Sequence, residues 1–222
     1  RFRYSGIVTL APCNYWTLGY SFVNGRGSSS SNASATAVYV ETKFNNLSYR
    51  NNSIPFFGDE RRPIFNACVG QIGEYHFGSN DLDGDSLTYK LVCARSSAVT
   101  CVNYRIGFSA SSPVSGAKLD TTTGRFRFNP RTAGRRIIAV QVNEYNRCTG
   151  AWVGSTLRDV TMHAVTCTNN YPSYTYGIHK ATGSATKLDS FRLKVKAGKP
   201  FTIEDTIYDP DTSDTLVLFS NH

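Results

Sequence analysis

The sequence predicts an all-β fold built from tandem β-sandwich repeats, and three observations support this prediction. First, the chain contains 13 tyrosines, 13 phenylalanines and 18 glycines, a composition that favours strands joined by turns. Second, apolar and polar residues alternate, as in FRLKVK at 191–196, and no stretch of helical length has a helical period. Third, a strand, an acidic turn and another strand occur twice in that order.

The repeat is visible when VGQIGEYHFGSNDLDGDSLTYKL (69–91) is aligned with AGKPFTIEDTIYDPDTSDTLVLFS (197–220). Three pairs of aspartates correspond, with one inserted residue before the last pair: Asp81 and Asp209, Asp83 and Asp211, Asp85 and Asp214. Internal similarity at a regular spacing is typical of a tandem array.

We therefore divide the 222 residues into three parts. Residues 1–66 are expected to form an N-terminal strand-rich unit that belongs to a preceding β-sandwich. Residues 67–168 form a complete Ig-like β-sandwich, and residues 169–222 form the lead-in and first half of the next Ig-like repeat. Within the first part, strands are expected near 3–12, 16–23 and 37–45, and the Gly- and Ser-rich stretch 25–35 is expected to be a flexible loop.

The acidic turn DLDGD (81–85) has the form of a calcium site. Ca²⁺ takes six to eight oxygen ligands, and aspartates that alternate around a glycine can converge on one ion. The flanking helices and terminal glutamate of an EF-hand are missing, so the ligands are predicted to be Asp81, Asp83 and Asp85, with Glu144 added from the end of a later strand. The second turn predicts a similar site at Asp209, Asp211 and Asp214. The alternative is two ordinary acidic turns without metal.

Six cysteines and no CxxC pair argue against zinc and for disulfides. Cys93 and Cys101 bracket a loop-sized segment, CARSSAVTC, and are predicted to pair, the alternative being buried free thiols. The remaining four allow three pairings between which the sequence does not choose: Cys13, Cys68, Cys148 and Cys167. Disulfides indicate an extracellular location.

The formal net charge is +8, concentrated in GRFRFNPRTAGRR (124–136) and FRLKVKAGK (191–199). These segments fit either attraction to acidic glycans or the solvated faces of half-buried strands. No nucleic-acid motif accompanies the charge, so nucleic acid is not an expected partner. No apolar run reaches the roughly 20 residues of a membrane helix, so membrane insertion is not expected either.

Several segments carry a resemblance to a known family. DLDGDSLTYKL and LDTTTGRFRFNPRTAGRRIIAVQVNEY (119–145) resemble the cadherin-like, dystroglycan-type Ig repeats of bacterial surface proteins. YSGIVTLAPCNYW (4–16), YVETKFNNLSYRNNSIPFF (39–57), CVGQ (68–71) and VNEYNRCTGAWVGSTLRDVTMHAVTC (142–167) are similar to the repeats of very large secreted surface proteins of Bacteroidota, the gliding-motility adhesins included.

The resemblance implies type IX secretion, attachment to the cell surface, and a filamentous adhesin whose partners are neighbouring repeats of the same chain and a surface polysaccharide or abiotic surface. It also implies O-glycosylation at Asp-Ser or Asp-Thr sites of that phylum, and four residues fit the pattern: Ser86, Thr121, Thr206 and Thr215.

Two other functions compete with the adhesin. In a carbohydrate-binding module, four aromatic residues would form a stacking platform: Tyr15, Trp16, Tyr20 and Trp152. In a secreted enzyme, the segment would be a spacer. The sequence has no GxSxG, HExxH or P-loop motif, and although Asp159 and Glu144 could imitate a glycosidase pair, catalysis is not expected of this chain.

Overall fold

The computed structural model describes residues 5–26, 30–34, 36–57, 64–168, 173–174, 178–189, 192–209, 211 and 214–215. Every regular element of these described residues is a β-strand, so the predicted all-β class is confirmed. The strand pairs are antiparallel with a single exception among the named strands, β5 with β13. Parts of two predicted segments, the loop at 25–35 and the unit at 169–222, lie outside the described residues.

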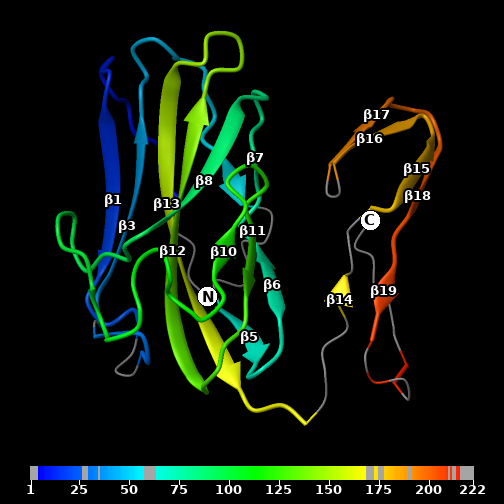
Figure 1. The fold of residues 1–222 in the computed structure, drawn as a ribbon. Coiled ribbons are helices and arrows are strands. Elements are labelled where there is room, and N and C mark those ends of the chain that lie inside the picture. Colours follow the sequence, from blue (N-terminus) through cyan, green and yellow to red (C-terminus); the bar gives the residue numbers. More distant parts are fainter. Residues whose placement is uncertain are drawn as a thin grey trace.

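The largest sheet has the strand order β1-β3-β13-β12-β8, and β5 pairs with the far end of β13 (Figure 1). Its strands are β1 (Trp16–Phe22), β3 (Val38–Phe44), β5 (Ile64–Cys68), β8 (Ser86–Val92), β12 (Gly134–Tyr145) and β13 (Trp152–Val165). Strands β12 and β13 form a long hairpin at the centre, which the sequence GRRIIAVQVNEY favours because β-branched residues pack well on a pleated surface.

A smaller sheet of order β10-β11-β6 faces the large sheet. It contains β6 (Gly73–His76), β10 (Lys118–Leu119) and β11 (Arg125–Phe128). Two short ribbons complete this part of the fold, β2 (Ala33–Ser34) with β9 (Asn103–Tyr104) and β4 (Phe56–Phe57) with β7 (Ser79–Asn80).

The main hydrophobic core lies between these two sheets. Phe126 and Phe128 of β11 and Phe77 are buried against the large sheet, where Val140 and Val142 of β12 meet them. The opposite face of β12 is also covered, and a second cluster forms there: Ala33, Ala94, Val102, Ile137, Ala139 and Leu157. Strand β12 is therefore buried on both faces, which explains its nearly continuous apolar run.

Strands β1 and β3 come from the segment assigned to a separate N-terminal unit, but they belong to the same sheet as residues 67–168. β3 pairs with β13 at Gly154, Ser155 and Thr156, and the Thr42 and Thr156 hydroxyls lie 3.3 Å apart. These two segments therefore share one sheet. The bounds of β1 and β3 agree closely with the predicted ranges 16–23 and 37–45, whereas residues 5–12 contain no strand.

The C-terminal region repeats a local arrangement of the main body. Strand β14 (Ser173–Tyr174) pairs with β19 (Ile207–Tyr208), directly before the second acidic turn. In the same way, β4 pairs with β7 directly before the first acidic turn. Two antiparallel pairs complete the region: the hairpin of β16 (Ala185–Asp189) with β17 (Arg192–Val195), and the flanking strands β15 (Lys180–Gly183) and β18 (Phe201–Glu204). The sequence repeat thus has a counterpart in strand pairing.

Candidate metal centre

The first acidic turn, residues 81–85, connects β7 to β8 and is organised by Asp81. Asp81 Oδ1 accepts hydrogen bonds of 3.0 Å from the backbone N–H groups of both Asp83 and Asp85. Gly84 has a φ of +78°, a left-handed conformation that glycine adopts without a steric penalty. The short aspartate side chain and the glycine therefore determine the local shape of the turn.

Glu144 reaches this turn from the end of β12. It pairs with Leu87 of β8 in the sheet register, and its side chain is fully buried. Alternation along β12 places it on the core side together with Val140 and Val142. Gly154 lies opposite on β13, where a Cβ atom would come within 3.2 Å of Glu144 Oε2 and 2.8 Å of the Lys43 carbonyl oxygen. The glycine therefore leaves the space that the carboxylate occupies.

Three carboxylates converge at this point. One oxygen from each of Asp81, Asp85 and Glu144 lies within 4.8 Å of the others. The protein also holds these carboxylates: Asn52 Nδ2 donates to Glu144 Oε1 at 2.7 Å, and the Arg147 N–H donates to Asp85 Oδ1 at 3.0 Å. Each of the three carboxylates thus accepts at least one hydrogen bond that fixes its position.

Two oxygens of these carboxylates are buried without a hydrogen-bond partner among the described residues, Asp81 Oδ2 and Glu144 Oε2. The pKa of Glu144 is raised to about 7, mainly by burial; the hydrogen bond from Asn52 lowers it, and the charges of Asp81 and Asp85 and the hydrogen bond that a protonated Glu144 makes to Asp81 raise it. Unpaired buried acceptors are rare in folded proteins because each loses its hydration without compensation. A cation between these oxygens would satisfy both of them.

Asp83, which the sequence also predicted as a ligand, is placed differently. Its Oδ2 accepts a hydrogen bond of 2.5 Å from the Ser53 N–H, and it lies outside the group of three converging carboxylates. No local sequence pattern marks Asn52, Ser53 or Gly154 as part of this centre, because the three residues are polar or small and lie far from the turn in the sequence.

The second predicted site also brings its residues together. Oxygens of Asp209, Asp211 and Asp214 lie within 4.8 Å of one another. The Asp211 N–H donates to Asp209 Oδ1 at 2.9 Å, as the Asp83 N–H does to Asp81. Asp214 is exposed and the other two are half-buried. No glutamate of the described residues joins this cluster.

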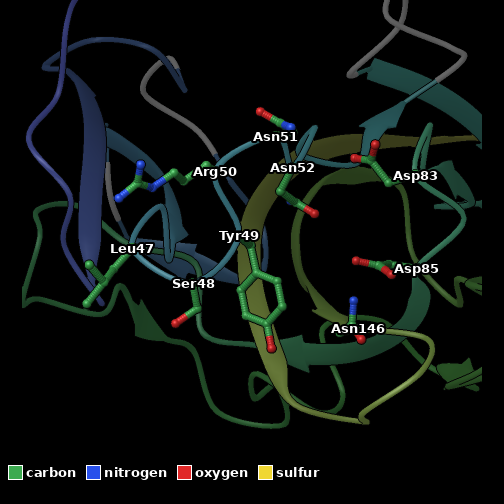
Figure 2. A pocket seen from close by; sticks show the side chains of 9 residues that line it. All are labelled: Leu47, Ser48, Tyr49, Arg50, Asn51, Asn52, Asp83, Asp85 and Asn146. Carbon is green, nitrogen blue, oxygen red and sulfur yellow. The ribbon is translucent and has the colours of Figure 1, made fainter.

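An open pocket of about 510 Å³ borders the first cluster (Figure 2). Its wall consists of nine residues, namely Leu47, Ser48, Tyr49, Arg50, Asn51, Asn52, Asp83, Asp85 and Asn146. Figure 2 shows Asn52, Asp83 and Asp85 directed toward a common space. Asp85 belongs both to the pocket wall and to the three converging carboxylates, so the pocket and the candidate ion position are adjacent.

Two disulfides are present. Cys93 is bonded to Cys101 with 5.7 Å between their Cα atoms, and Cys68 is bonded to Cys167 with 5.4 Å. The second pairing follows from the parallel contact of β5 with β13, which places Cys68 opposite Val165. Cys13 and Cys148 are free. Disulfides indicate a non-cytoplasmic location.

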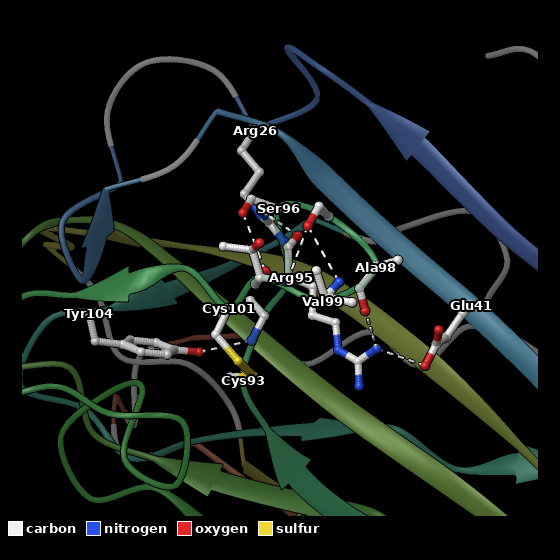
Figure 3. The surroundings of a disulfide bond; sticks show 12 residues. Arg26, Glu41, Cys93, Arg95, Ser96, Ala98, Val99, Cys101 and Tyr104 are labelled. Atoms are coloured by element: carbon white, nitrogen blue, oxygen red, sulfur yellow. Dashed lines mark hydrogen bonds and ion pairs between the residues drawn. A yellow bond between two sulfur atoms is a disulfide. The ribbon is translucent and has the colours of Figure 1, made fainter.

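The loop that the Cys93–Cys101 disulfide closes is anchored by charged side chains (Figure 3). Arg95 donates to Glu41 Oε1 at 2.8 Å and to the Ala98 carbonyl at 3.2 Å. Nearby, Arg26 forms a buried ion pair with Asp159. Asp159 therefore has a structural partner. It lies five positions along β13 from Gly154, the residue paired with Glu144, so the two acids are apart and do not form a glycosidase-like pair.

The four aromatic residues of the alternative carbohydrate platform fall into two pairs. Tyr15 and Trp152 stack with 5.6 Å between ring centroids, and Lys43 Nζ lies 5.5 Å from the Tyr15 ring. Trp16 and Tyr20 lie four residues apart on β1 and therefore share one face of that strand.

The four glycosylation candidates, Ser86, Thr121, Thr206 and Thr215, are exposed, and Ser86 follows the metal turn directly.

The part of the chain that the structure describes contains no helix long and apolar enough to cross a membrane. No protein-family model, no curated protein and no solved structure matches this chain.

Proposed function

We propose that this chain is a calcium-stiffened structural segment of a large extracellular bacterial surface adhesin or filament, built from tandem Ig-like, cadherin- or dystroglycan-type β-sandwiches. The proposal combines the all-β fold, the disulfides and the repeated acidic turn with the resemblance to the gliding-motility adhesins of Bacteroidota. Its role is mechanical, and its partners are neighbouring repeats and an external surface.

The observation that supports calcium binding most strongly is the state of Glu144. A fully buried glutamate whose Oε2 has no partner, beside two aspartates, is costly to keep in a folded protein unless a cation or a proton neutralises it. All the converging ligands are carboxylate oxygens, which hard cations such as Ca²⁺ prefer. The carboxylates of an exposed acidic turn stay hydrated and do not carry this cost.

The ion would connect three segments that are distant in sequence. Asn52 and Ser53 bind Glu144 and Asp83, respectively, and the Arg147 N–H binds Asp85. The loop after β3, the acidic turn and the β12–β13 hairpin therefore meet at the cluster. An ion that neutralises the carboxylates stabilises all these contacts together, so it limits the relative movement of the three segments.

The disulfides stiffen other parts of the same body. Cys68–Cys167 connects residues separated by 99 positions and joins β5 to the chain after β13. Closing so long a loop removes conformational freedom mainly from the unfolded chain. A segment stabilised in this way suits an adhesin that is pulled outside the cell.

Calorimetric titration of the 222-residue chain with Ca²⁺, together with thermal melting, tests the proposal. At a calcium concentration of about 100 times Kd, binding stabilises the folded state by about 2.7 kcal/mol, which corresponds to a Tm increase of about 5–10 °C. A chelator should reverse the increase.

Glu144→Gln should greatly reduce this calcium-induced increase because it removes the buried negative charge. The matched control is Glu74→Gln on β6, where the glutamate forms ion pairs with Arg125 and Arg127 and lies outside the cluster. A Tm that does not change in millimolar calcium, or a Glu144→Gln variant that keeps the whole increase, would contradict calcium stiffening.

A further inference from the structure

The three converging carboxylates leave at least half of a calcium coordination shell unfilled. Asp81, Asp85 and Glu144 each offer one oxygen to the cluster, and each carboxylate also accepts a hydrogen bond from the protein. Because Ca²⁺ takes six to eight oxygens, about three or more must come from elsewhere. Asp85 also belongs to the wall of the 510 Å³ pocket, so oxygens of a molecule in that pocket can complete the shell.

The charge around the pocket disfavours an anionic occupant. Asp81, Asp83, Asp85 and Glu144 supply four negative charges, whereas the ion supplies two positive charges and Arg50 on the pocket wall and Arg147, whose Nη1 lies 3.8 Å from the Cβ position of Gly84, supply one each. The carboxylates and cations balance, so a carboxylate or phosphate in the pocket gains no net attraction and meets the like charges of Asp83 and Asp85 on the pocket wall. Neutral oxygen ligands, such as hydroxyl groups, carry no such penalty.

The remaining wall of the pocket suits hydroxyl groups. Ser48, Tyr49 and Asn51 offer two hydroxyls and an amide, which both donate and accept hydrogen bonds. Asn146 Oδ1 accepts from the N–H groups of Cys148 and Thr149, and Figure 2 shows its amide nitrogen directed toward Asp85. The Tyr49 ring adds an aromatic face of the kind that packs against apolar C–H groups.

We propose that this pocket binds a neutral saccharide, two adjacent hydroxyls of which coordinate the calcium ion while its other hydroxyls bind the pocket wall. The inference depends on calcium binding at Asp81, Asp85 and Glu144, and it gives the stiffening ion a second role in recognition. Ligand binding in the pocket then requires calcium, whereas calcium binding does not require the saccharide.

The test measures binding of methyl mannoside, methyl galactoside and methyl glucoside to the 222-residue chain by saturation-transfer NMR and calorimetry, in millimolar calcium and again with excess chelator. We expect at least one glycoside to bind in calcium and its binding to fall at least tenfold in chelator. Galacturonic acid, which has the hydroxyls and a negative charge, should bind more weakly than methyl galactoside.

A double variant, Ser48→Ala with Asn51→Ala, separates recognition from calcium binding. Both residues are exposed, so the fold and the calcium-induced increase in Tm should remain, while glycoside binding falls at least tenfold. Ser111→Ala, an exposed serine outside the pocket, is the matched control and should change neither measurement.

The two proposals fail in different ways. If calcium raises the Tm but no glycoside of the panel binds, or if binding persists in chelator, the saccharide site is wrong and the stiffening role stands. Stronger binding of galacturonic acid would overturn the choice of a neutral ligand. If calcium does not change the Tm, the stiffening role is lost, and the saccharide site, which requires the ion, is lost with it.

Discussion

Asn52 Nδ2 donates a hydrogen bond of 2.7 Å to Glu144 Oε1 across 92 positions of sequence. This contact connects the loop after β3 to the buried end of β12, and it leaves Glu144 Oε2 as the oxygen without a hydrogen-bond partner. The amide stabilises the charged form of the glutamate, because it lowers a pKa that burial raises.

Asn52→Ala should therefore weaken calcium binding and destabilise the fold. The substitution leaves a second buried oxygen of Glu144 without a partner, a loss of about 1–3 kcal/mol. Denaturant unfolding and calcium calorimetry on the variant measure the two effects. The neighbouring Asn51→Ala, whose side chain is exposed, is the control, and equal behaviour of the two variants would contradict the role of Asn52.

The calcium-free protein should lose stability as the pH rises from about 4.5 to 7. The pKa of Glu144 is raised from 4.5 to about 7 in the folded protein, so the folded state binds its proton more tightly than the unfolded state. Stability from this group is complete below pH 4.5 and is lost as the pH rises through 7, at most by about 3 kcal/mol.

Chemical denaturation of the calcium-free chain between pH 4.5 and 8 measures this loss. In Glu144→Gln the same interval should show a much flatter profile, since glutamine does not ionise. Saturating calcium should remove the loss in the unmodified chain, because the ion favours the ionised carboxylate. If the stability of the calcium-free Glu144→Gln variant fell equally steeply with pH, groups other than Glu144 would cause the pH dependence.

Gly154→Ala should destabilise the fold and weaken calcium binding. The added Cβ would lie 2.8 Å from the Lys43 carbonyl oxygen and 3.2 Å from Glu144 Oε2, so backbone and carboxylate must both move. We expect a loss of about 1–3 kcal/mol, the usual cost of overpacking a core position. Thermal melting measures it, and Gly6→Ala, where no atom lies within 4 Å of the added Cβ, should leave the Tm unchanged.

Loss of the Cys68–Cys167 disulfide should cost more stability than loss of Cys93–Cys101, by about 2 kcal/mol in the chain-entropy model. The two bonds close segments of 99 and 8 residues, and the chain-entropy model gives about 4.7 kcal/mol for a 100-residue loop and about 3 for 15 residues. Double serine variants of each pair, compared by denaturant unfolding, test the order. Equal losses would show that effects in the folded state outweigh loop entropy.

Local features of the sequence were sufficient for the strand class and the acidic turns. The alternation of apolar and polar residues predicted β1 and β3 closely because side chains of a strand point to opposite faces in turn. The pattern DLDGD predicted a turn because Asp81 binds the backbone of its own neighbours and Gly84 accepts a positive φ. Both effects act within a few residues, so neighbouring letters contain the necessary information.

Residues 1–66 illustrate what such patterns leave open. Their strands are visible in the sequence, but the sheet that β3 joins depends on its pairing with β13, more than 100 residues away. Pairing partners are chosen by which apolar faces the whole chain can bury together, and alternation within a single strand does not specify the partner.

The sequence by itself determined that the chain forms strands, that it carries two similar acidic turns, and that Cys93 and Cys101 can close a loop. Only the tertiary structure decided that Asp85 and Asp81 converge with Glu144 while Asp83 turns to Ser53, that Cys68 pairs with Cys167, and that Asn52 and Gly154 belong to the centre. The physical reason is the distance along the chain between the residues involved. Turns and alternation arise from neighbouring residues. The other contacts exist only after the long β12–β13 hairpin has packed between its neighbours and brought distant side chains to one end of the core.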